Sequence, residues 1–422
     1  MGRVIAPTSI TCRWLFLVLA LAWLGVLAEG QPSSLPDDRK RLLMHFMPWY
    51  IAPNYRDHWG RHWTGHERQH DPTQIDATGR RDIWSHYDPL IGPYDSADPD
   101  VLECQLLQMK LAGIDGVIVD WYGIADAANY PPSHAATQAV FAATGRLGMQ
   151  FAVCYEDRTV KHLVEIGHLA EAEIEPHLIE TFRWMKVNWF DAAHYTKIDG
   201  RPLLLNFGPI DKRLREPERW NAARDSIEPR PKLFALHHLW EEAGVDGGFT
   251  WFHPDAWANH ADSASVRRRL TDIHHETGDP SRVIPSAVPG FRDVYTDPHP
   301  VIDHRRGQTL RDSLTAAMAG PWTHVQLATW NDYGEGTMIE PTREFGYTFL
   351  EVIQEARGQE LGNAFPFAAE DLRLPTRLLM LRRAGTAPEN TLDAIAERLM
   401  AGDTDTARTQ LDTLNSQAER FP

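Results

Sequence analysis

Eight short apolar runs alternate with helical patterns over roughly 300 residues of this chain, which is the size and rhythm of a (β/α)8 barrel. The runs cover residues 42–50, 116–122, 150–156, 202–207, 233–237, 248–252, 283–288 and 325–330. Between them, residues 101–112, 135–148 and 160–188 show the periodicity of helices. The pattern predicts an α/β protein with a (β/α)8 TIM-type barrel; a doubly wound open sheet would show the same alternation.

The runs are apolar throughout and become polar only where each one ends, as expected for strands buried on both faces. Active sites of such barrels lie at the carboxyl ends of the strands, so these polar endings are candidate binding residues. They include Trp49, Tyr50, Asp120, Trp121, Tyr122, Glu156 and Trp251.

The last run leads into a turn that carries two carboxylates three residues apart, Asp332 and Glu335. Trp330, Asn331 and Tyr333 lie beside them. Cleavage of a sugar acetal needs one carboxyl that arrives protonated and one that stays ionised, so this turn is a candidate catalytic site. A solvated acidic turn is the structural alternative.

Composition favours a carbohydrate partner over nucleic acid. The chain of 422 residues has a net charge of −16 and no long run of Lys and Arg, so binding to a phosphate backbone is not expected. Its 15 tryptophans are a rich supply, and several adjoin polar loop residues. Indole faces can stack on the C–H faces of sugars, although ordinary core packing accounts for some of them.

The ends of the chain differ from the barrel region. Arg3 and Arg13 precede an apolar run from Trp14 to Ala28 that is shorter than the roughly twenty residues of a membrane span. Residues 1–28 are therefore expected to be a cleaved signal peptide, which implies a secreted or periplasmic protein with no stable membrane span; an uncleaved anchor is the alternative.

The rest of the chain is expected to have three parts. Residues 29–39 are predicted to be a linker, 40–356 the catalytic domain and 357–422 a helical extension, with short amphipathic helices at 392–401 and 406–414. Cys104, on a helix, and Cys154, in a strand, are expected to be free thiols.

Several motifs resemble one group of enzymes. These are Met47-Pro-Trp-Tyr50 and the segments 86–100, 112–123, 285–293 and 329–341. They resemble, in order along the chain, glycoside hydrolase families 71 and 99, which contain the α-1,3-glucanases and the endo-acting α-mannosidases. The resemblance implies a (β/α)8 barrel and an enzyme that hydrolyses α-glycosidic bonds of a glucan or mannan.

The resemblance also implies roles for individual residues. Glu335 corresponds to the general acid and Asp332 to the base, and Glu156 corresponds to a glutamate that supports substrate hydroxyls. Tyr50 and Tyr122 correspond to aromatic residues of the mouth. Two alternatives remain open from the residues themselves: Glu156 could pair with Arg158 in a buried salt bridge, and the two tyrosines could serve rim packing.

One position departs from family 99, where both carboxylates of this motif are glutamates; family 71 instead has Asn-Asp-Tyr-Gly-Glu, as here. Aspartate withdraws its carboxylate by about 1.5 Å, one C–C bond length. The space admits a water molecule, which favours an inverting reaction.

A histidine series offers a competing function. His58, His62, His66 and His70 recur every fourth residue, with His45 nearby, as a helical metal site would require. Gly60, Gly65 and Pro53 disfavour a regular helix there, so we expect no metal and no other cofactor, and the loop histidines with Trp59 or Trp63 line a sugar subsite instead. Three hypotheses follow: a glycoside hydrolase, a non-catalytic carbohydrate-binding barrel, and a metal-dependent hydrolase.

Overall fold

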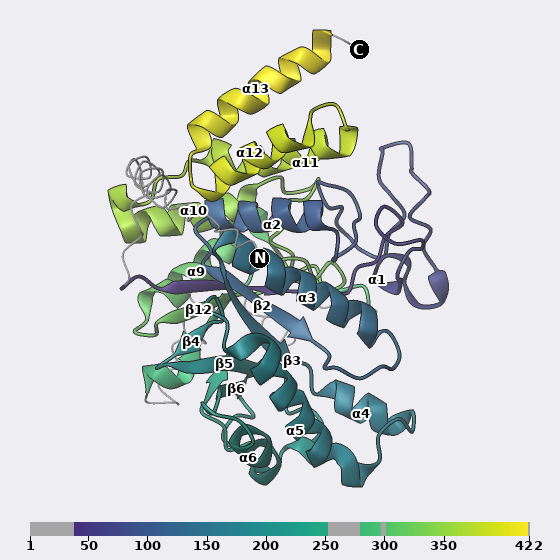
Figure 1. Cartoon of the computed structure of the whole chain (residues 1–422), viewed down its shortest axis with the longest axis vertical. Coiled ribbons are helices and arrows are strands. Elements are labelled where there is room, and N and C mark those ends of the chain that lie inside the picture. The colour runs from purple at the N-terminus through teal and green to yellow at the C-terminus, as the bar shows by residue number, and fades with distance from the viewer. Residues whose placement is uncertain (1–37, 252–278, 297–300, 421–422) are drawn as a thin grey trace, which may run out of the picture.

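The computed structural model describes residues 38–251, 279–296 and 301–420, and its centre is a parallel β-barrel wrapped by helices (Figure 1). The sheet has the order β8-β7-β6-β5-β3-β2-β1-β12-β9, and every neighbouring pair on this path is parallel. The strands are β1 (Arg41–Phe46), β2 (Gly116–Trp121), β3 (Gln150–Tyr155), β5 (Arg201–Asn206), β6 (Lys232–Leu236), β7 (Gly247–Phe249), β8 (Val283–Ile284), β9 (Ser286–Ala287) and β12 (His324–Leu327). The predicted barrel fold is confirmed.

The seventh predicted run is divided at Pro285 into β8 and β9. Pro285 has no N–H to donate, but its carbonyl oxygen accepts a hydrogen bond from Gln326 N at 2.8 Å. β8 pairs with β7, whereas β9 pairs with β12. One stretch of chain therefore joins both edges of the sheet, which closes the barrel and excludes the open-sheet alternative.

The helices are α1 (Arg61–Thr64), α2 (Pro99–Leu111), α3 (Tyr130–Leu147), α4 (Arg158–Glu165), α5 (Ile174–Met185), α6 (Pro217–Asp225), α9 (Gln308–Ala319), α10 (Thr348–Leu361), α11 (Leu374–Ala384), α12 (Glu389–Met400) and α13 (Thr404–Arg420). α2 begins where Asp98 caps its N-terminus, accepting from Asp100 N at 3.0 Å, with Pro99 in the first turn. It ends at Gly113, whose φ of +83° a glycine adopts most easily.

The long helical region predicted over 160–188 is divided into several elements, including a short 3-10 helix, Glu171–Glu173. α4 and α5 are separated near Gly167, which has a φ of +71°, and α5 continues into a short π-helical segment, Lys186–Phe190. Shorter pairings complete the fold: β4 (Lys197–Ile198) lies antiparallel to β5, and β10 (Phe291–Arg292) lies antiparallel to β11 (Val301–Ile302).

Strand alternation divides the core into two layers. On β1, Leu43 points into the barrel, whereas its neighbours Leu42 and Met44 pack towards the helices. On β2, Ile118 points inward and Val119 outward in the same way. The same alternation decides which side chains reach the barrel mouth.

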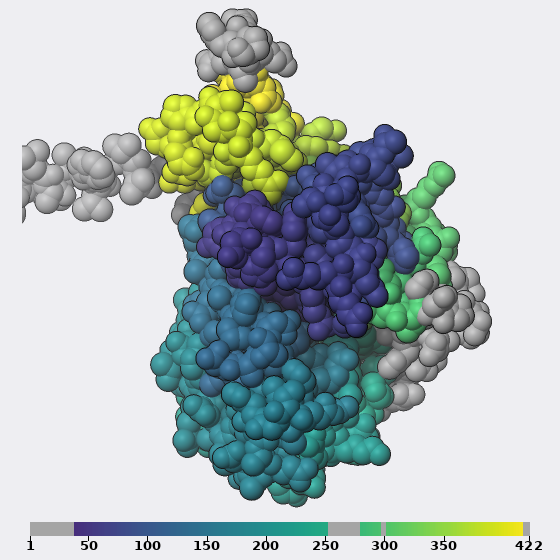
Figure 2. All heavy atoms as spheres, turned by 90° about the vertical axis from the view of Figure 1, so that its right-hand side faces the viewer, coloured from purple at the N-terminus to yellow at the C-terminus, as the bar shows by residue number. Residues whose placement is uncertain are grey.

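The C-terminal helices are packed against the barrel. Leu378, Leu392 and Leu411 belong to the same apolar core as the barrel helices, and Arg382 on α11 pairs with Glu103 on α2 at 3.0 Å. The expected boundary between residues 356 and 357 falls within α10. Figure 2 shows α11 to α13 directly above the segment that precedes α2.

The predicted signal peptide lies outside the described residues, as does nearly all of the predicted linker. Within the described part of the chain, no helix combines the length and the apolar character that crossing a membrane requires. Cys104 lies on α2 and Cys154 lies on β3, and both are buried free thiols, as expected.

Candidate active site

Polar side chains occupy the inward positions at the carboxyl ends of the first three strands. Strand alternation places His45, Asp120 and Cys154 there, and all three are buried. His45 Nδ1 lies 3.4 Å from Oε1 of Gln326 on β12, and its Nε2 lies 3.9 Å from Oδ1 of Asp120. The interior of the barrel is thus apolar further down and polar at this mouth.

The turn that follows β12 lies across the mouth and is fixed by buried hydrogen bonds to the end of β1. The Asn331 side chain accepts from Met47 N at 2.8 Å and donates to Met47 O at 3.0 Å. The Tyr50 hydroxyl donates to Asn331 O at 2.8 Å and accepts from Tyr333 N at 3.1 Å. Tyr50, Asn331 and Tyr333 therefore hold the turn in place.

A buried carboxylate, Glu340, anchors the far end of this segment. It accepts hydrogen bonds from the Tyr94 hydroxyl at 2.7 Å, from Gln105 Nε2 at 2.7 Å and from the Tyr333 hydroxyl at 2.8 Å. Burial raises the pKa of Glu340 to about 7 in spite of these donors. Glu340 was not predicted as a functional residue, because the sequence does not show that three donors converge on it.

Asp332 and Glu335 lie in the same turn, and a backbone hydrogen bond links them. Asp332 Oδ1 accepts from Glu335 N at 2.9 Å, and the backbone N of Asp332 donates to Thr329 Oγ1 at 2.9 Å. Asp332 is buried, whereas the Glu335 side chain is partly exposed. Within the described structure, Glu335 Oε2 is buried and has no hydrogen-bond partner.

The surroundings of both carboxyls favour the protonated form. Burial raises the pKa of Asp332 to about 7, and the charge of Asp120 acts in the same direction. Burial also raises the pKa of Glu335 well above its ordinary value, followed by repulsion from Asp332, while Arg158 opposes the shift. A water-poor site with neighbouring carboxylates is typical of acid–base catalysis.

A second segment, residues 292–295, packs closely against the acidic turn. The backbone N atoms of Arg292 and Val294 donate to the carbonyl oxygens of Glu335 and Gly334, both at 2.9 Å. A Cβ added at Gly334 would lie 1.9 Å from the Tyr295 hydroxyl, so only glycine fits there. Burial raises the pKa of the Tyr295 hydroxyl, with further contributions from Asp332 and Glu335. Tyr295 was not predicted, because it lies just beyond the motif at 285–293.

Three of the predicted binding residues border this mouth and are partly exposed: Trp49, Tyr122 and Trp251. Trp49 stacks on His62 with ring centroids 4.3 Å apart. The Tyr122 hydroxyl donates to Asp120 Oδ2 at 2.6 Å, and Trp251 meets His45 edge-on at 5.0 Å. Among these residues and their partners, Asp120 acts on the carboxyl pair, since its charge raises the pKa of both Asp332 and Glu335.

Two other predicted binding residues are not at the mouth. Trp121 points outward from β2, donates from Nε1 to His134 Nδ1 at 3.1 Å and packs against Trp184 and Trp189. Because successive strand residues face opposite sides, Asp120 and Trp121 cannot both line the interior. Trp330 is fully buried in the core that includes the helices.

Glu156 forms the ion pair that was considered as the structural alternative. Arg158 Nε and Nη2 donate to its two carboxylate oxygens at 3.0 Å and 2.9 Å. Burial raises the pKa of Glu156, the arginine opposes this effect, and the charge of Asp120 adds to it. Glu156 therefore belongs to the same electrostatic neighbourhood as Asp332 and Glu335, with an arginine already bound.

The histidine series does not form a metal site. The four rings have separate neighbours: His58 bonds to Asp57, His62 stacks on Trp49, His66 contacts Trp84 and His70 bonds to Asp82. Among the described residues, the group closest to a metal-ligand set is His45, Asp120 and Cys154, whose ligand atoms lie within 4.8 Å of one another. Burial raises the pKa of the Cys154 thiol well above its usual value, which disfavours the thiolate that a metal ion needs.

Comparison with known proteins shows which enzymes this chain is similar to. No family model matches the chain. The glycoprotein endo-alpha-1,2-mannosidase-like protein of Mus musculus is 25% identical over 344 residues, which are 74% of this chain and 72% of that protein. The protein of the same name from Homo sapiens is 25% identical over 324 residues, or 70% and 67% of the two chains.

A solved structure agrees with these relatives at the level of the fold. The family 99 endo-alpha-mannosidase of Bacteroides thetaiotaomicron superposes with a TM-score of 0.57 at 18% identity, covering 78% of this chain and 99% of that one. The resemblance drawn from the motifs is confirmed by both comparisons. The chain is similar in sequence to endo-alpha-1,2-mannosidase-like proteins and in fold to a family 99 endo-alpha-mannosidase.

Proposed function

We propose that this protein hydrolyses α-glycosidic bonds of a mannan- or glucan-type glycan, with Glu335 as general acid and Asp332 as base. The observation that carries the proposal is the position of both carboxyls in one hydrogen-bonded turn at the barrel mouth. The relatives named as endo-alpha-1,2-mannosidase-like proteins make an α-mannan the first substrate to try.

The protonation order supports this division of roles. Glu335 is the group whose pKa is raised well above its ordinary value, so it holds a proton for the leaving oxygen. Asp332 has a pKa of about 7 and becomes a carboxylate at a lower pH than Glu335 does. Once ionised, Asp332 further disfavours ionisation of Glu335.

The reaction is inverting in this proposal. Asp332 removes a proton from a water molecule whose oxygen forms the new bond to the anomeric carbon. Glu335 gives its proton to the glycosidic oxygen as that bond breaks, so the pair ends with the proton exchanged. The shorter aspartate leaves the room that this water needs, since carboxyls of inverting enzymes stand roughly 6.5–9.5 Å apart.

Separate substitutions of the two acids test the proposal. Asp332→Asn is expected to lower kcat by about 100-fold or more on both an α-mannan and an α-glycosyl fluoride, because both need an activated water. Glu335→Gln is expected to lower kcat strongly on the polysaccharide and much less on the fluoride, because fluoride leaves without a proton.

NMR of the first product then gives its anomeric form. Release of the β-anomer supports inversion, and release of the α-anomer excludes it. If neither substitution changes hydrolysis of any α-glycan, the carboxyl pair is not catalytic, and a non-catalytic carbohydrate-binding barrel becomes the better description.

The proposal includes export, which rests on the apolar run from Trp14 to Ala28 behind Arg3 and Arg13. N-terminal sequencing of the mature protein from fractionated cells tests it. A mature chain that starts near Glu29 supports cleavage, whereas a retained Trp14–Ala28 segment in the membrane fraction supports an anchor.

A further inference from the structure

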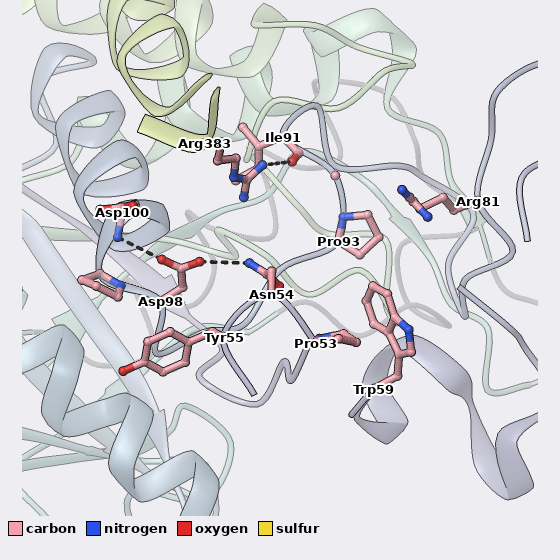
Figure 3. A pocket seen from close by; sticks show the side chains of 12 residues that line it. Pro53, Asn54, Tyr55, Trp59, Arg81, Ile91, Pro93, Asp98, Asp100 and Arg383 are labelled. Carbon is pink, nitrogen blue, oxygen red and sulfur yellow. Dashed lines mark hydrogen bonds between the residues drawn. The ribbon is translucent and has the colours of Figure 1, made fainter. Parts of the chain in front are cut away.

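A separate pocket of about 600 Å³ lies beside the barrel mouth, in the size range of small-ligand sites. It is bounded by the loop after β1, by the turn before α2 and by the end of α11. Its lining includes Tyr55, Trp59, Arg81, Asp98, Asp100 and Arg383 (Figure 3). None of these residues belongs to the turn that carries Asp332 and Glu335.

The pocket nevertheless lies at the same end of the barrel as the two acids. The loop after β1, which forms one side of the pocket, follows Tyr50 in the chain. The turn before α2 forms another side and contacts the same residue, because Tyr50 N donates to Ser96 Oγ at 3.1 Å. The same loop continues from Trp59 to His62, which stacks on Trp49 at the mouth. One extended chain molecule could therefore reach both places along a continuous face.

Charged side chains of both signs line the pocket, and Arg383 lies on the same side as Asp98 and Asp100. The close view has Trp59 and Arg81 on one side and Asp98 and Asp100 on the other (Figure 3). Among the described residues, Arg81 donates one hydrogen bond, to Pro72 O at 2.9 Å, and the Asp100 carboxylate accepts none. Most of the hydrogen-bonding capacity of these two side chains thus remains for a ligand.

The charges and surfaces favour a neutral polyhydroxylated ligand. The N-terminus of α2 is already capped by Asp98, and the charges of Asp98 and Asp100 are balanced by those of Arg81 and Arg383, so the lining has no net charge that would favour an ionic ligand. A purely apolar ligand would bury Asp100 and Arg81 without partners. A sugar offers hydroxyls to both sides and an apolar C–H face to Trp59 and the half-exposed Tyr55.

We propose that this pocket is an accessory carbohydrate-binding site, which holds a second part of the glycan chain that the acids cleave. The choice of glycan rests on the proposed function, but binding in the pocket does not need the catalytic acids. Trp59 supplies the stacking face, Arg81 donates to hydroxyls, and Asp100 accepts from them.

Affinity electrophoresis of the whole protein, in gels with and without α-mannan or α-1,3-glucan, measures binding without relying on hydrolysis. Trp59→Ala is expected to weaken binding at least about fivefold, Trp59→Phe to retain most of it, and Arg81→Ala and Asp100→Asn to weaken it less than Trp59→Ala does. Arg215→Ala is the matched control, since Arg215 likewise donates to one carbonyl oxygen, that of Pro209, but lies outside the pocket.

Steady-state kinetics provide the second readout. Trp59→Ala is expected to raise KM on the polysaccharide at least about fivefold and to leave kcat and KM on an α-glycosyl fluoride unchanged. Thermal unfolding checks that each variant is folded; if Trp59→Ala does not fold, Arg81→Ala and Asp100→Asn decide the question.

Failure of this inference differs from failure of the proposed function. A wild-type protein that cleaves α-glycans but binds them as well after Trp59→Ala, Arg81→Ala and Asp100→Asn overturns the accessory site alone. A protein that binds in a Trp59-dependent way but cleaves nothing overturns the carboxyl mechanism and leaves the site standing. If neither tested glycan slows the migration of the wild-type protein in the gel, the accessory site is also overturned.

Discussion

At the residue scale, burial raises the pKa of two neighbouring acids, and their charges and hydrogen bonds distinguish them. Asp332 and Glu335 share a turn, yet the pKa of Glu335 is raised by burial and then again by the charge of Asp332. Burial also raises the pKa of Asp332, but hydrogen bonds from two backbone N–H groups, those of Glu335 and Gly334, lower it. The turn itself thus separates the two titrations, as two carboxyls with different roles require.

This separation sets the expected pH dependence of activity. The base must be ionised, so kcat/KM should rise as the pH passes through about 7, where Asp332 loses its proton. It should fall again at a higher pH, where Glu335 ionises and can no longer protonate the leaving oxygen. A kcat/KM profile between pH 4 and 10 checks this, and a rising limb near pH 4 would contradict the raised pKa of the base.

The same electrostatics predict a shift that can be measured without substrate. Asp332→Asn removes the charge that opposes ionisation of Glu335, so the pKa of Glu335 should fall towards its ordinary value. NMR titration of ¹³C-labelled glutamate side chains measures this pKa directly. Asp157→Asn is the control, because Asp157 is also a buried carboxyl with a raised pKa but is not among the main charges acting on Glu335. Equal pKa values for Glu335 in the wild type and in Asp332→Asn would disprove the coupling.

Individual residues also show how much of a site can be predicted from the sequence. Strand alternation alone would have separated Asp120 and Tyr122 from Trp121, which the structure places on the outer face of β2. The burial of Tyr50, Asn331 and Tyr333 could not be predicted in this way, because the hydrogen bonds of the Tyr50 hydroxyl to Asn331 and Tyr333 join residues 281 and 283 positions apart. The proximity of the two proposed acids could be predicted because both lie in one turn.

At the element scale, the acidic turn depends on the loop after β1. The Tyr50 hydroxyl donates to Asn331 O and accepts from Tyr333 N, two backbone groups of the turn. Tyr50 is 1% exposed, so water cannot replace the lost partner easily. The positions of the two proposed catalytic acids therefore depend on the Tyr50 hydroxyl.

Tyr50→Phe tests that dependence. The substitution removes one partner from both Asn331 O and Tyr333 N, which keep only their hydrogen bond to each other at 2.9 Å, and should destabilise the fold by about 1 kcal/mol. It should also lower kcat about tenfold or more, because the turn carrying both acids relaxes. Tyr195→Phe is the matched control: Tyr195 is equally buried and donates to Leu203 O at 2.8 Å, away from the mouth. Urea unfolding and kcat are compared, and equal kcat losses in the two variants would argue against a positioning role for Tyr50.

The elements themselves were largely predictable. Seven of the eight apolar runs became single strands, because residues buried on both faces must be apolar whatever their partners are. The remaining run, at 283–288, was also predicted, but its division at Pro285 was not. Its two halves pair with different neighbouring strands. The break between α4 and α5 was missed because a lone glycine in a helical pattern is a weak signal.

At the scale of the whole molecule, one buried arginine joins the end of the chain to the base of the barrel. Arg357 on α10 is 0% exposed and donates to Gly113 O at 2.7 Å and to Lys40 O at 2.8 Å. It also forms an ion pair with Asp115 and another with Glu360 at 2.5 Å. These groups precede β1 and β2, so they lie at the end of the barrel opposite to the acids.

Arg357→Met should therefore weaken the fold without altering the chemistry. Two buried carbonyl oxygens and the carboxylate of Asp115 lose a donor, and the expected cost is about 3 kcal/mol, close to that of breaking a buried ion pair. Arg219→Met provides the comparison, since its pair with Glu216 at 3.3 Å is largely exposed and its loss should cost less than about 1 kcal/mol. Urea unfolding gives both free energies, and kcat on an α-glycan at low temperature should equal that of the wild type in both variants. A fall in kcat for Arg357→Met while the protein is still folded would mean that the two ends of the barrel are coupled, contrary to the independence inferred here.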